Sequence, residues 1–213
     1  SLRRQRQMCK ETALVERANK IKIGGPTDDK AETGPLISAE HREKVAAYVD
    51  KAREQGAKIL TGGRAATSED TNGQHGTGTT DLGAGVYYLP TIIDGATREM
   101  DCVHDEAFGP TVTIETFTTE EEAIEIANDT EYGLAGAVYT SDAGRAERVA
   151  RALRHGTIWI NDFHPYLPQA EWGGYKQSGN GRELGPTGLA EYQEHKHVYQ
   201  NLSPAAWDQF GLQ

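Results

Sequence analysis

The stretch Ala170–Gly185, which reads AEWGGYKQSGNGRELG, combines side chains that could do chemistry with an unusual backbone composition. Its five glycines stand among aromatic, basic and acidic side chains. A glycine inside a helix or strand costs about 0.5–1 kcal/mol relative to alanine, so this density excludes an ordinary element interior. The pattern predicts a loop whose backbone passes close to a ligand or to another segment. A glycine-rich surface turn is the alternative.

The composition restricts the partners that we expect. The chain has 213 residues and a formal net charge of −10, which argues against binding to nucleic acid or to an anionic membrane surface. Two isolated cysteines, Cys9 and Cys102, are typical of a reducing compartment, and we expect a cytoplasmic protein. No apolar run is long enough to predict a membrane-spanning helix.

The first half of the chain contains one clear helix and one long polar stretch. Ser38 is a good N-cap for a helix to about Gln55, whose inner face would carry Val45, Tyr48, Val49 and Ala52. A short strand is expected near residues 58–60. The next 22 residues, 64–85, are polar with almost no apolar anchor, and we predict a mobile loop insertion there. Residues 86–93 resemble a strand interrupted at Pro90, which favours a sheet edge.

The second half alternates between strand and helix patterns. Strands are expected over residues 111–117, 135–139 and 157–161, with a helix capped by Thr118 and a second helix between them. This alternation predicts an α/β fold with a doubly wound, mainly parallel sheet. A last strand over His195–Leu202 has no obvious partner, so we expect it to pair with another subunit in a homo-oligomer, a dimer or a tetramer.

Six segments in a fixed order resemble the NAD(P)-dependent aldehyde dehydrogenase family. The resemblance covers nearly all of the chain from about Glu11, but less than half of a full-length family member. The segments are IKIGGPTDDKAETGPLIS (Ile21–Ser38), DEAFGP (Asp105–Pro110), NDTEYGLAGAVYT (Asn128–Thr140), GTIWIN (Gly156–Asn161), WGGYKQSGNGRELG (Trp172–Gly185) and GLAEYQEHKHV (Gly188–Val198).

The resemblance implies a domain plan. Residues 11–194 would form part of a catalytic α/β domain, residues 195–213 an oligomerisation strand and tail, and residues 1–10 stay unassigned. In this family a cysteine thiolate attacks the aldehyde, and the resemblance places that cysteine and the general-base glutamate outside this chain. Cys9 lacks the family's Gly-Gln-x-Cys context, so we do not expect it to be the nucleophile, whereas Cys102 is expected to be a buried core thiol.

Within the family, residues 161–184 look most like the betaine aldehyde dehydrogenases, which oxidise a quaternary-ammonium aldehyde. Trp172 matches the aromatic of their cation site, and Tyr166 is a second candidate for that wall. Glu106 matches the carboxylate that binds the ribose hydroxyls of the nicotinamide coenzyme, and Phe108 matches an aromatic near its ring. The implied coenzyme is NAD, with NADP as the alternative.

Two further roles follow from the resemblance. Glu183 matches a glutamate of a proton relay, with an ion pair to Arg182 or Lys176 as the structural alternative. The backbone carbonyls of Lys176 and Gly179 match a potassium site of some family members.

Other functions stay open at the level of sequence. The enzyme could use aminobutyraldehyde or another aldehyde as its substrate. The 213-residue chain alone could be a non-catalytic remnant or interaction domain, and we expect it to be inactive by itself.

Overall fold

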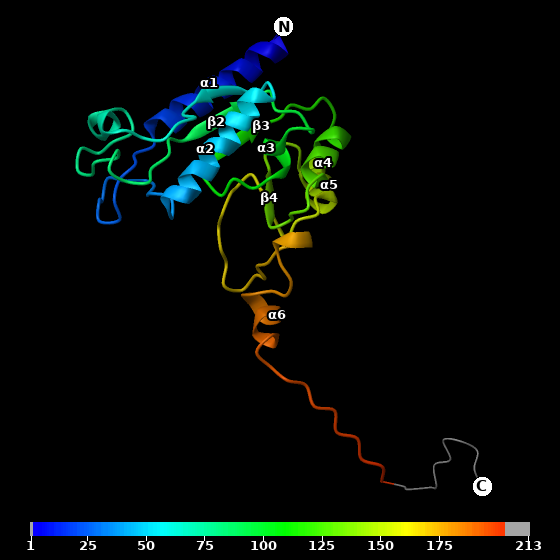
Figure 1. Cartoon of the computed structure of the whole chain (residues 1–213). Coiled ribbons are helices and arrows are strands. Elements are labelled where there is room, and N and C mark those ends of the chain that lie inside the picture. Colours follow the sequence, from blue (N-terminus) through cyan, green and yellow to red (C-terminus); the bar gives the residue numbers. More distant parts are fainter. Residues whose placement is uncertain (1, 203–213) are drawn as a thin grey trace. The chain divides into compact units, whose positions relative to one another are not determined.

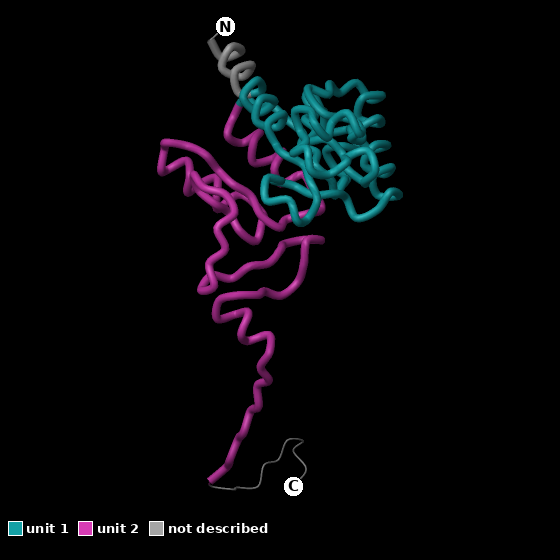
Figure 2. Tube along the Cα trace, turned by 90° about the vertical axis from the view of Figure 1, so that its left-hand side faces the viewer, with its two compact units in different colours: residues 1–118 teal, residues 119–213 magenta. Residues whose placement is uncertain are grey.

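A computed structural model describes residues 2–202, with the side chains described from residue 11 onward. The chain divides into two compact units, Ser1–Thr118 and Thr119–Gln213, which are shown in different colours in Figure 2. The elements of the first unit (Figure 1) are α1 (Leu2–Lys20), α2 (Ala39–Glu54), β1 (Lys58–Thr61), η1 (Ser68–Asn72), β2 (Thr91–Asp94), α3 (Asp101–His104) and β3 (Thr111–Ile114). The elements of the second unit are α4 (Glu120–Asn128), β4 (Ala135–Val138), α5 (Ala143–Ala152), β5 (Thr157–Ile160), η2 (Lys176–Ser178) and α6 (Gly185–Ala190).

The sheet of the first unit has the order β1-β2-β3. The central strand β2 runs antiparallel to β1 and parallel to β3, with Thr91 opposite Thr111. The prediction that the strand containing Pro90 lies at an edge is therefore wrong. The strand begins at Thr91, directly after the proline, so the missing N–H of Pro90 lies outside the ladder.

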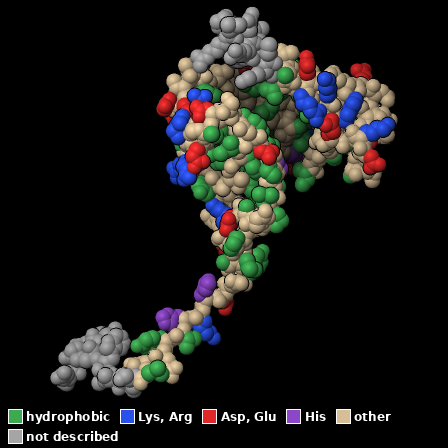
Figure 3. All heavy atoms as spheres, turned by 180° about the vertical axis from the view of Figure 1, so that it is seen from behind, with side chains coloured by type: hydrophobic (Ala, Val, Ile, Leu, Met, Phe, Trp, Pro, Cys, Tyr) green, Lys and Arg blue, Asp and Glu red, His purple; other side chains and the backbone are tan. Residues whose placement is uncertain are grey.

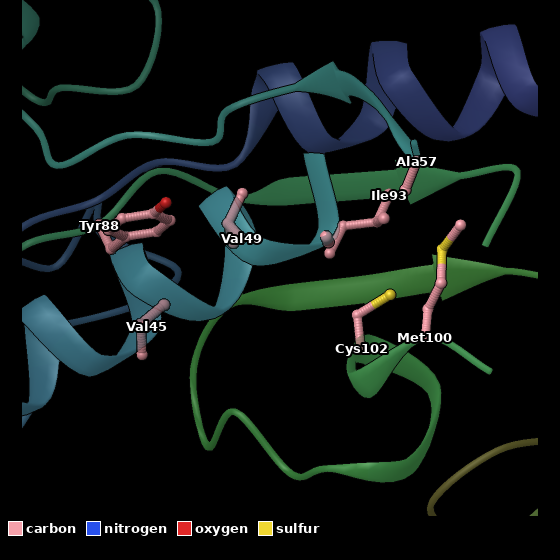
Figure 4. Close-up of a cluster of buried hydrophobic side chains, with 8 residues drawn as sticks. Val45, Val49, Ala57, Tyr88, Ile93, Met100 and Cys102 are labelled. Carbon is pink, nitrogen blue, oxygen red and sulfur yellow. The ribbon is translucent and has the colours of Figure 1, made fainter. Parts of the chain in front are cut away.

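Helix α2 forms as the sequence predicts and supplies one side of the main core. The Ser38 hydroxyl accepts a hydrogen bond from the His41 N–H at 3.1 Å, which is the expected N-cap. Figure 4 shows Val45 and Val49 of this helix in a cluster of buried side chains with Tyr88, Ile93 and Cys102. Cys102 is a free, buried thiol, as predicted, and burial raises its pKa.

Residues 64–85 are anchored more firmly than the sequence indicates. Leu82 is fully buried and Ala66 nearly so, and both pack in a second core cluster with Ile23, Tyr87 and Leu89. The expectation of almost no apolar anchor is therefore wrong. Two isolated apolar residues give no periodic signal in a sequence, yet they can bury fully against partners elsewhere in the chain.

In the second unit, β4 and β5 pair in parallel, with Ala135 opposite Thr157, and α5 connects them. Thr119 caps α4 by accepting a hydrogen bond from the Glu122 N–H, so the predicted cap at Thr118 is wrong by one residue. The predicted alternation of strands and helices is confirmed. The described strands form a three-stranded and a two-stranded sheet, and a continuous doubly wound sheet stays a prediction.

Both ends of the chain differ from the sequence analysis. The helix α1 runs from Leu2 to Lys20 and includes residues 2–10, for which the sequence predicts no element. Residues 193–202 form no helix or strand, so the predicted strand over His195–Leu202 is not formed in the single chain. A strand requires a neighbour for its backbone hydrogen bonds, and the described part of this chain offers none to that segment. Residues 203–213 of the predicted tail lie outside the described residues.

Candidate functional site

The loop Asp105–Pro110 is fixed to the first unit by side chains from one face of α2. The hydroxyl oxygen of Tyr48 lies 2.8 Å from the Cys102 carbonyl and 3.0 Å from the Asp105 carbonyl. Nε2 of His41 lies 2.8 Å from the Phe108 carbonyl. Helical spacing predicts Tyr48 on the inner face of the helix. It gives no link between Tyr48 or His41 and this loop, because only the fold brings residues 41–48 and 102–108 together.

Glu106 and Phe108 extend from this loop into solvent. Both residues line an open pocket of about 380 Å³, together with Tyr48 and backbone and side chains of β3. Phe108 is 77% exposed and has a positive φ of 50°, a conformation that is uncommon outside glycine. An exposed carboxylate and an exposed aromatic ring at one pocket can accept hydroxyl hydrogen bonds and cover a flat ring, respectively.

The second unit contains a cluster of aromatic rings around Trp172. The ring centroids of Tyr166 and Trp172 are 4.5 Å apart, and those of Trp159 and Trp172 are 5.9 Å apart. Trp159 is buried and its indole N–H donates to the Pro165 carbonyl at 3.3 Å, whereas Trp172 is half-buried and Tyr166 is 47% exposed. The cluster therefore rests on a buried tryptophan and presents two partly exposed rings.

Sequence reasoning missed three members of this cluster, Trp159, Phe163 and His164. Phe163 and His164 join it, with ring centroids 5.3 Å and 5.9 Å from that of Trp159. The signal in the sequence is the recurrence of aromatic residues and histidine between residues 159 and 172, which follows the end of β5. His164 also packs edge-on against Tyr166, at 4.8 Å.

Glu183 is held beside Trp172 by the backbone. The two residues form an antiparallel bridge, in which the Trp172 N–H donates to the Glu183 carbonyl at 2.7 Å and the Glu183 N–H donates back at 2.8 Å. The Glu183 side chain is exposed. Arg182 donates to the Gly174 and Gly181 carbonyls, so the alternative of an ion pair between Glu183 and a neighbouring base is not found in the described residues.

The stretch around Lys176 is tied to the end of α4. The Lys176 ammonium donates to the carbonyls of Asn128 and Thr130, both at 2.9 Å. The Gly133 N–H donates to the Ser178 hydroxyl at 2.9 Å. This ammonium binds carbonyls near the carboxyl end of a helix, where positive charge is favourable.

Glycines permit close backbone contact between the stretch Ala170–Gly185 and the residues that precede β5. A Cβ added to Gly156 would lie 1.7 Å from the Gly173 carbonyl oxygen, and Gly174 is buried. This observation agrees with the expectation that the backbone passes close to another segment, and it shows that the stretch is docked and not a free surface turn.

Two features are absent from the described part of the chain. No group of three or more histidine, cysteine, aspartate and glutamate side chains in residues 11–202 could hold a metal ion. No helix in the described part of the chain is both long and apolar enough to cross a membrane.

Known proteins are similar to this chain in fold and in sequence. The crystal structure of betaine aldehyde dehydrogenase from Staphylococcus aureus in complex with NAD⁺ superposes with a TM-score of 0.84 at 49% identity, over 94% of this chain and 38% of that one. The betaine aldehyde dehydrogenase of Bacillus subtilis is 55% identical over 197 residues, and aminoaldehyde dehydrogenase 1 of Pisum sativum is 42% identical over 194.

The matches cover most of this chain but a smaller share of each relative. The match covers 92% of this chain but only 38% of the Bacillus subtilis protein, so the chain spans well under half the length of such relatives. The model of the aldehyde dehydrogenase family matches residues 9–198. The α/β fold class and the resemblance found in the sequence are thereby confirmed: the chain belongs to the aldehyde dehydrogenase family.

Proposed function

We propose that this chain is part of a cytoplasmic, NAD-dependent aldehyde dehydrogenase that oxidises betaine aldehyde to glycine betaine. The choice of substrate rests on the pair of partly exposed rings of Trp172 and Tyr166, of which Trp172 packs against buried Trp159. A trimethylammonium group has no N–H to donate, so aromatic faces are its best recognition element. Similarity to relatives described as betaine aldehyde dehydrogenases supports the same substrate.

The coenzyme site uses Glu106 and Phe108. An exposed carboxylate beside an open pocket suits the two vicinal hydroxyls of a ribose, because it can accept a hydrogen bond from each of them at the same time. The ring of Phe108 is free to cover the nicotinamide. NAD, when bound, accepts the hydride from the substrate. The chain's contribution is to orient the coenzyme, and the crystal structure of the Staphylococcus aureus relative with NAD⁺ supports NAD as this coenzyme.

Glu183 and the two carbonyls have supporting roles. Glu183 is exposed and its backbone is fixed to that of Trp172, so its carboxylate can accept a proton through water near the aldehyde. The carbonyl oxygens of Lys176 and Gly179 are the kind of ligand that suits potassium. These two residues supply two ligands at most through their backbones, so a complete shell requires further oxygens from elsewhere in the enzyme.

A substrate comparison on the intact enzyme tests the proposal. NADH formation is followed with betaine aldehyde, aminobutyraldehyde and propanal at equal concentrations. We expect the highest kcat/KM for betaine aldehyde. A higher kcat/KM for propanal would contradict a cation site at Trp172.

An aminoaldehyde is the second candidate substrate. It is favoured by the similarity to the aminoaldehyde dehydrogenases of Pisum sativum, at 41% and 42% identity. A primary ammonium donates hydrogen bonds, whereas a quaternary one does not. A preference for aminobutyraldehyde over betaine aldehyde in the same assay would favour this candidate.

A further inference from the structure

We propose that Tyr48 is a positioning residue of the coenzyme site, because its hydroxyl holds the peptide unit from which Glu106 begins. The inference rests on the proposed role of Glu106. The Asp105 carbonyl, 3.0 Å from the Tyr48 hydroxyl, belongs to the same planar peptide as the Glu106 N–H. Fixing this carbonyl therefore fixes the peptide plane that contains the N and Cα atoms of Glu106, and the Glu106 side chain begins at that Cα.

The same hydroxyl also reaches the Cys102 carbonyl, at 2.8 Å. Cys102 lies in α3, a helix of one turn whose carbonyls at the carboxyl end have no partner within the helix. One hydroxyl thus joins the short helix before the loop to the first peptide of the loop. The Tyr48 oxygen is the shared contact of these two carbonyls.

The neighbouring positions on α2 complete the attachment. His41, Val45 and Tyr48 are spaced by four and three residues, which places them on one face of the helix. His41 holds the Phe108 carbonyl at 2.8 Å, and Gly109 lies against Val45, where an added Cβ would be 2.8 Å from a methyl group. Glu106 is therefore flanked by contacts to α2 on both sides.

Tyr48 remains a hydrogen-bond donor at every working pH. Burial, followed by the nearby Cys102, Asp105 and Asp101, raises its pKa to about 12. A phenylalanine keeps the ring that packs against the core but removes the donor. Tyr48→Phe is thus a change of one atom at the loop and leaves the apolar cluster in place.

The experiment measures coenzyme binding to the intact enzyme. The dissociation constant for NAD, the KM for the aldehyde and the melting temperature are compared for Tyr48→Phe and for Tyr88→Phe. Tyr88 is the matched control, because it is a buried tyrosine of the same core cluster that lines a pocket with Phe108 and Gly109, whereas the hydrogen bonds to the loop come from Tyr48 and His41. We expect Tyr48→Phe to weaken NAD binding by roughly 3- to 10-fold, the effect of one lost hydrogen bond, and to leave the aldehyde KM unchanged. Tyr88→Phe should leave both constants unchanged.

A double-mutant cycle with Glu106→Gln separates positioning from general stability. If Tyr48 acts through Glu106, the loss caused by Tyr48→Phe disappears in the Glu106→Gln background. A loss of the same size in both backgrounds would overturn the inference, and so would unchanged NAD binding by Tyr48→Phe. If Glu106→Gln itself leaves NAD binding unchanged, the proposed role of Glu106 is wrong. This outcome distinguishes a failure of the proposed coenzyme site from a failure of the inference about Tyr48.

A second variant covers the case in which Tyr48→Phe does not fold. Gly109→Ala forces the loop away from α2 at its other end without touching the tyrosine. It is expected to weaken NAD binding while the aldehyde KM stays the same. Unchanged NAD binding by Gly109→Ala would overturn the inference.

Discussion

Trp172 takes its position from its neighbours and not from its own burial. It is half-buried, stacks at a tilt on the buried Trp159 and meets Tyr166 edge-on. Its backbone is fixed by two hydrogen bonds with Glu183. A ring that is held on three sides loses little conformational freedom when a cation binds to its remaining face, which favours affinity.

Asp70 ties down the segment 64–85 through its carboxylate. Arg64 forms two hydrogen bonds with its carboxylate, at 2.7 and 2.8 Å, and the Thr67 N–H forms a third at 2.7 Å. The Arg64 hydrogen bonds, followed by those from Thr67, lower the pKa of Asp70 well below its usual range. A lowered pKa means that the ionised form stabilises the folded segment above the unfolded pKa of about 3.9, and that this stability is lost as the pH falls.

Asp70→Asn should therefore destabilise this segment at pH 7 by about 1–2 kcal/mol. Hydrogen exchange of the amides of residues 67–75 in the intact enzyme measures the change, with Glu69→Gln as the neighbouring control. The difference between wild type and Asp70→Asn should shrink as the pH is lowered below about 4. A difference that is constant with pH would show that ionisation of Asp70 does not matter.

At the level of elements, the docking of the glycine-rich stretch depends on Gly156. An alanine there would place its Cβ 1.7 Å from the Gly173 oxygen, and this oxygen belongs to the backbone, so a segment must move. We expect Gly156→Ala to lower stability by about 1–3 kcal/mol. It should also raise the KM for betaine aldehyde more than the KM for NAD, because Gly173 adjoins Trp172.

The matched control for this change is Gly144→Ala in α5. A Cβ at Gly144 would be 3.4 Å from its nearest neighbours, an ordinary contact, and alanine favours a helix. Thermal unfolding and steady-state kinetics of the two variants give the comparison. If Gly156→Ala melts and binds substrate like Gly144→Ala, the close backbone approach is not required.

The elements that the sequence predicted are those with strong local signals. α2 has a capping serine and apolar residues at helical spacing, and β4 and β5 have short apolar runs between turns. The position of β2 in the centre of its sheet was not predictable, because strand order depends on partners far away in the chain. The same holds for Leu82, whose burial depends on Ile23 and Leu89.

The candidate functional residues of the two units differ in the same way. Glu106, Phe108, Trp172 and Glu183 could be named from local motifs, since each stands in a distinctive run of residues. Tyr48 has no such motif around it, and its contact with Asp105 spans 57 positions. A residue that acts by holding another one leaves no local pattern in a single sequence.

For the molecule as a whole, residues 193–202 matter because this described segment forms neither helix nor strand. Val198, Tyr199 and Leu202 are 81%, 79% and 85% exposed. Figure 3 shows hydrophobic side chains along this extended segment. Exposed apolar residues on an extended backbone outside any sheet are typical of a strand that pairs with another subunit, as we propose for a dimer or tetramer.

Proline substitutions test this pairing, because proline removes one N–H and leaves the chain length unchanged. Adjacent N–H groups of a strand point to opposite edges, so Val198→Pro and Tyr199→Pro together probe both. We expect at least one of them to reduce the assembly of the intact enzyme in sedimentation velocity, while Val198→Thr and Tyr199→Thr retain it. An unchanged assembly in both proline variants would contradict pairing through this segment.

The proposed function depends above all on recognition of a quaternary ammonium group by Trp172. The most direct measurement compares betaine aldehyde with 3,3-dimethylbutanal, a neutral aldehyde of nearly the same shape, in the intact enzyme and in Trp172→Ala. We expect the ratio of the two kcat/KM values to fall by roughly 3- to 30-fold in the variant, the range of a cation–π contact, and to fall less in Trp172→Phe. A ratio that is the same in the wild type and in Trp172→Ala would contradict the claim.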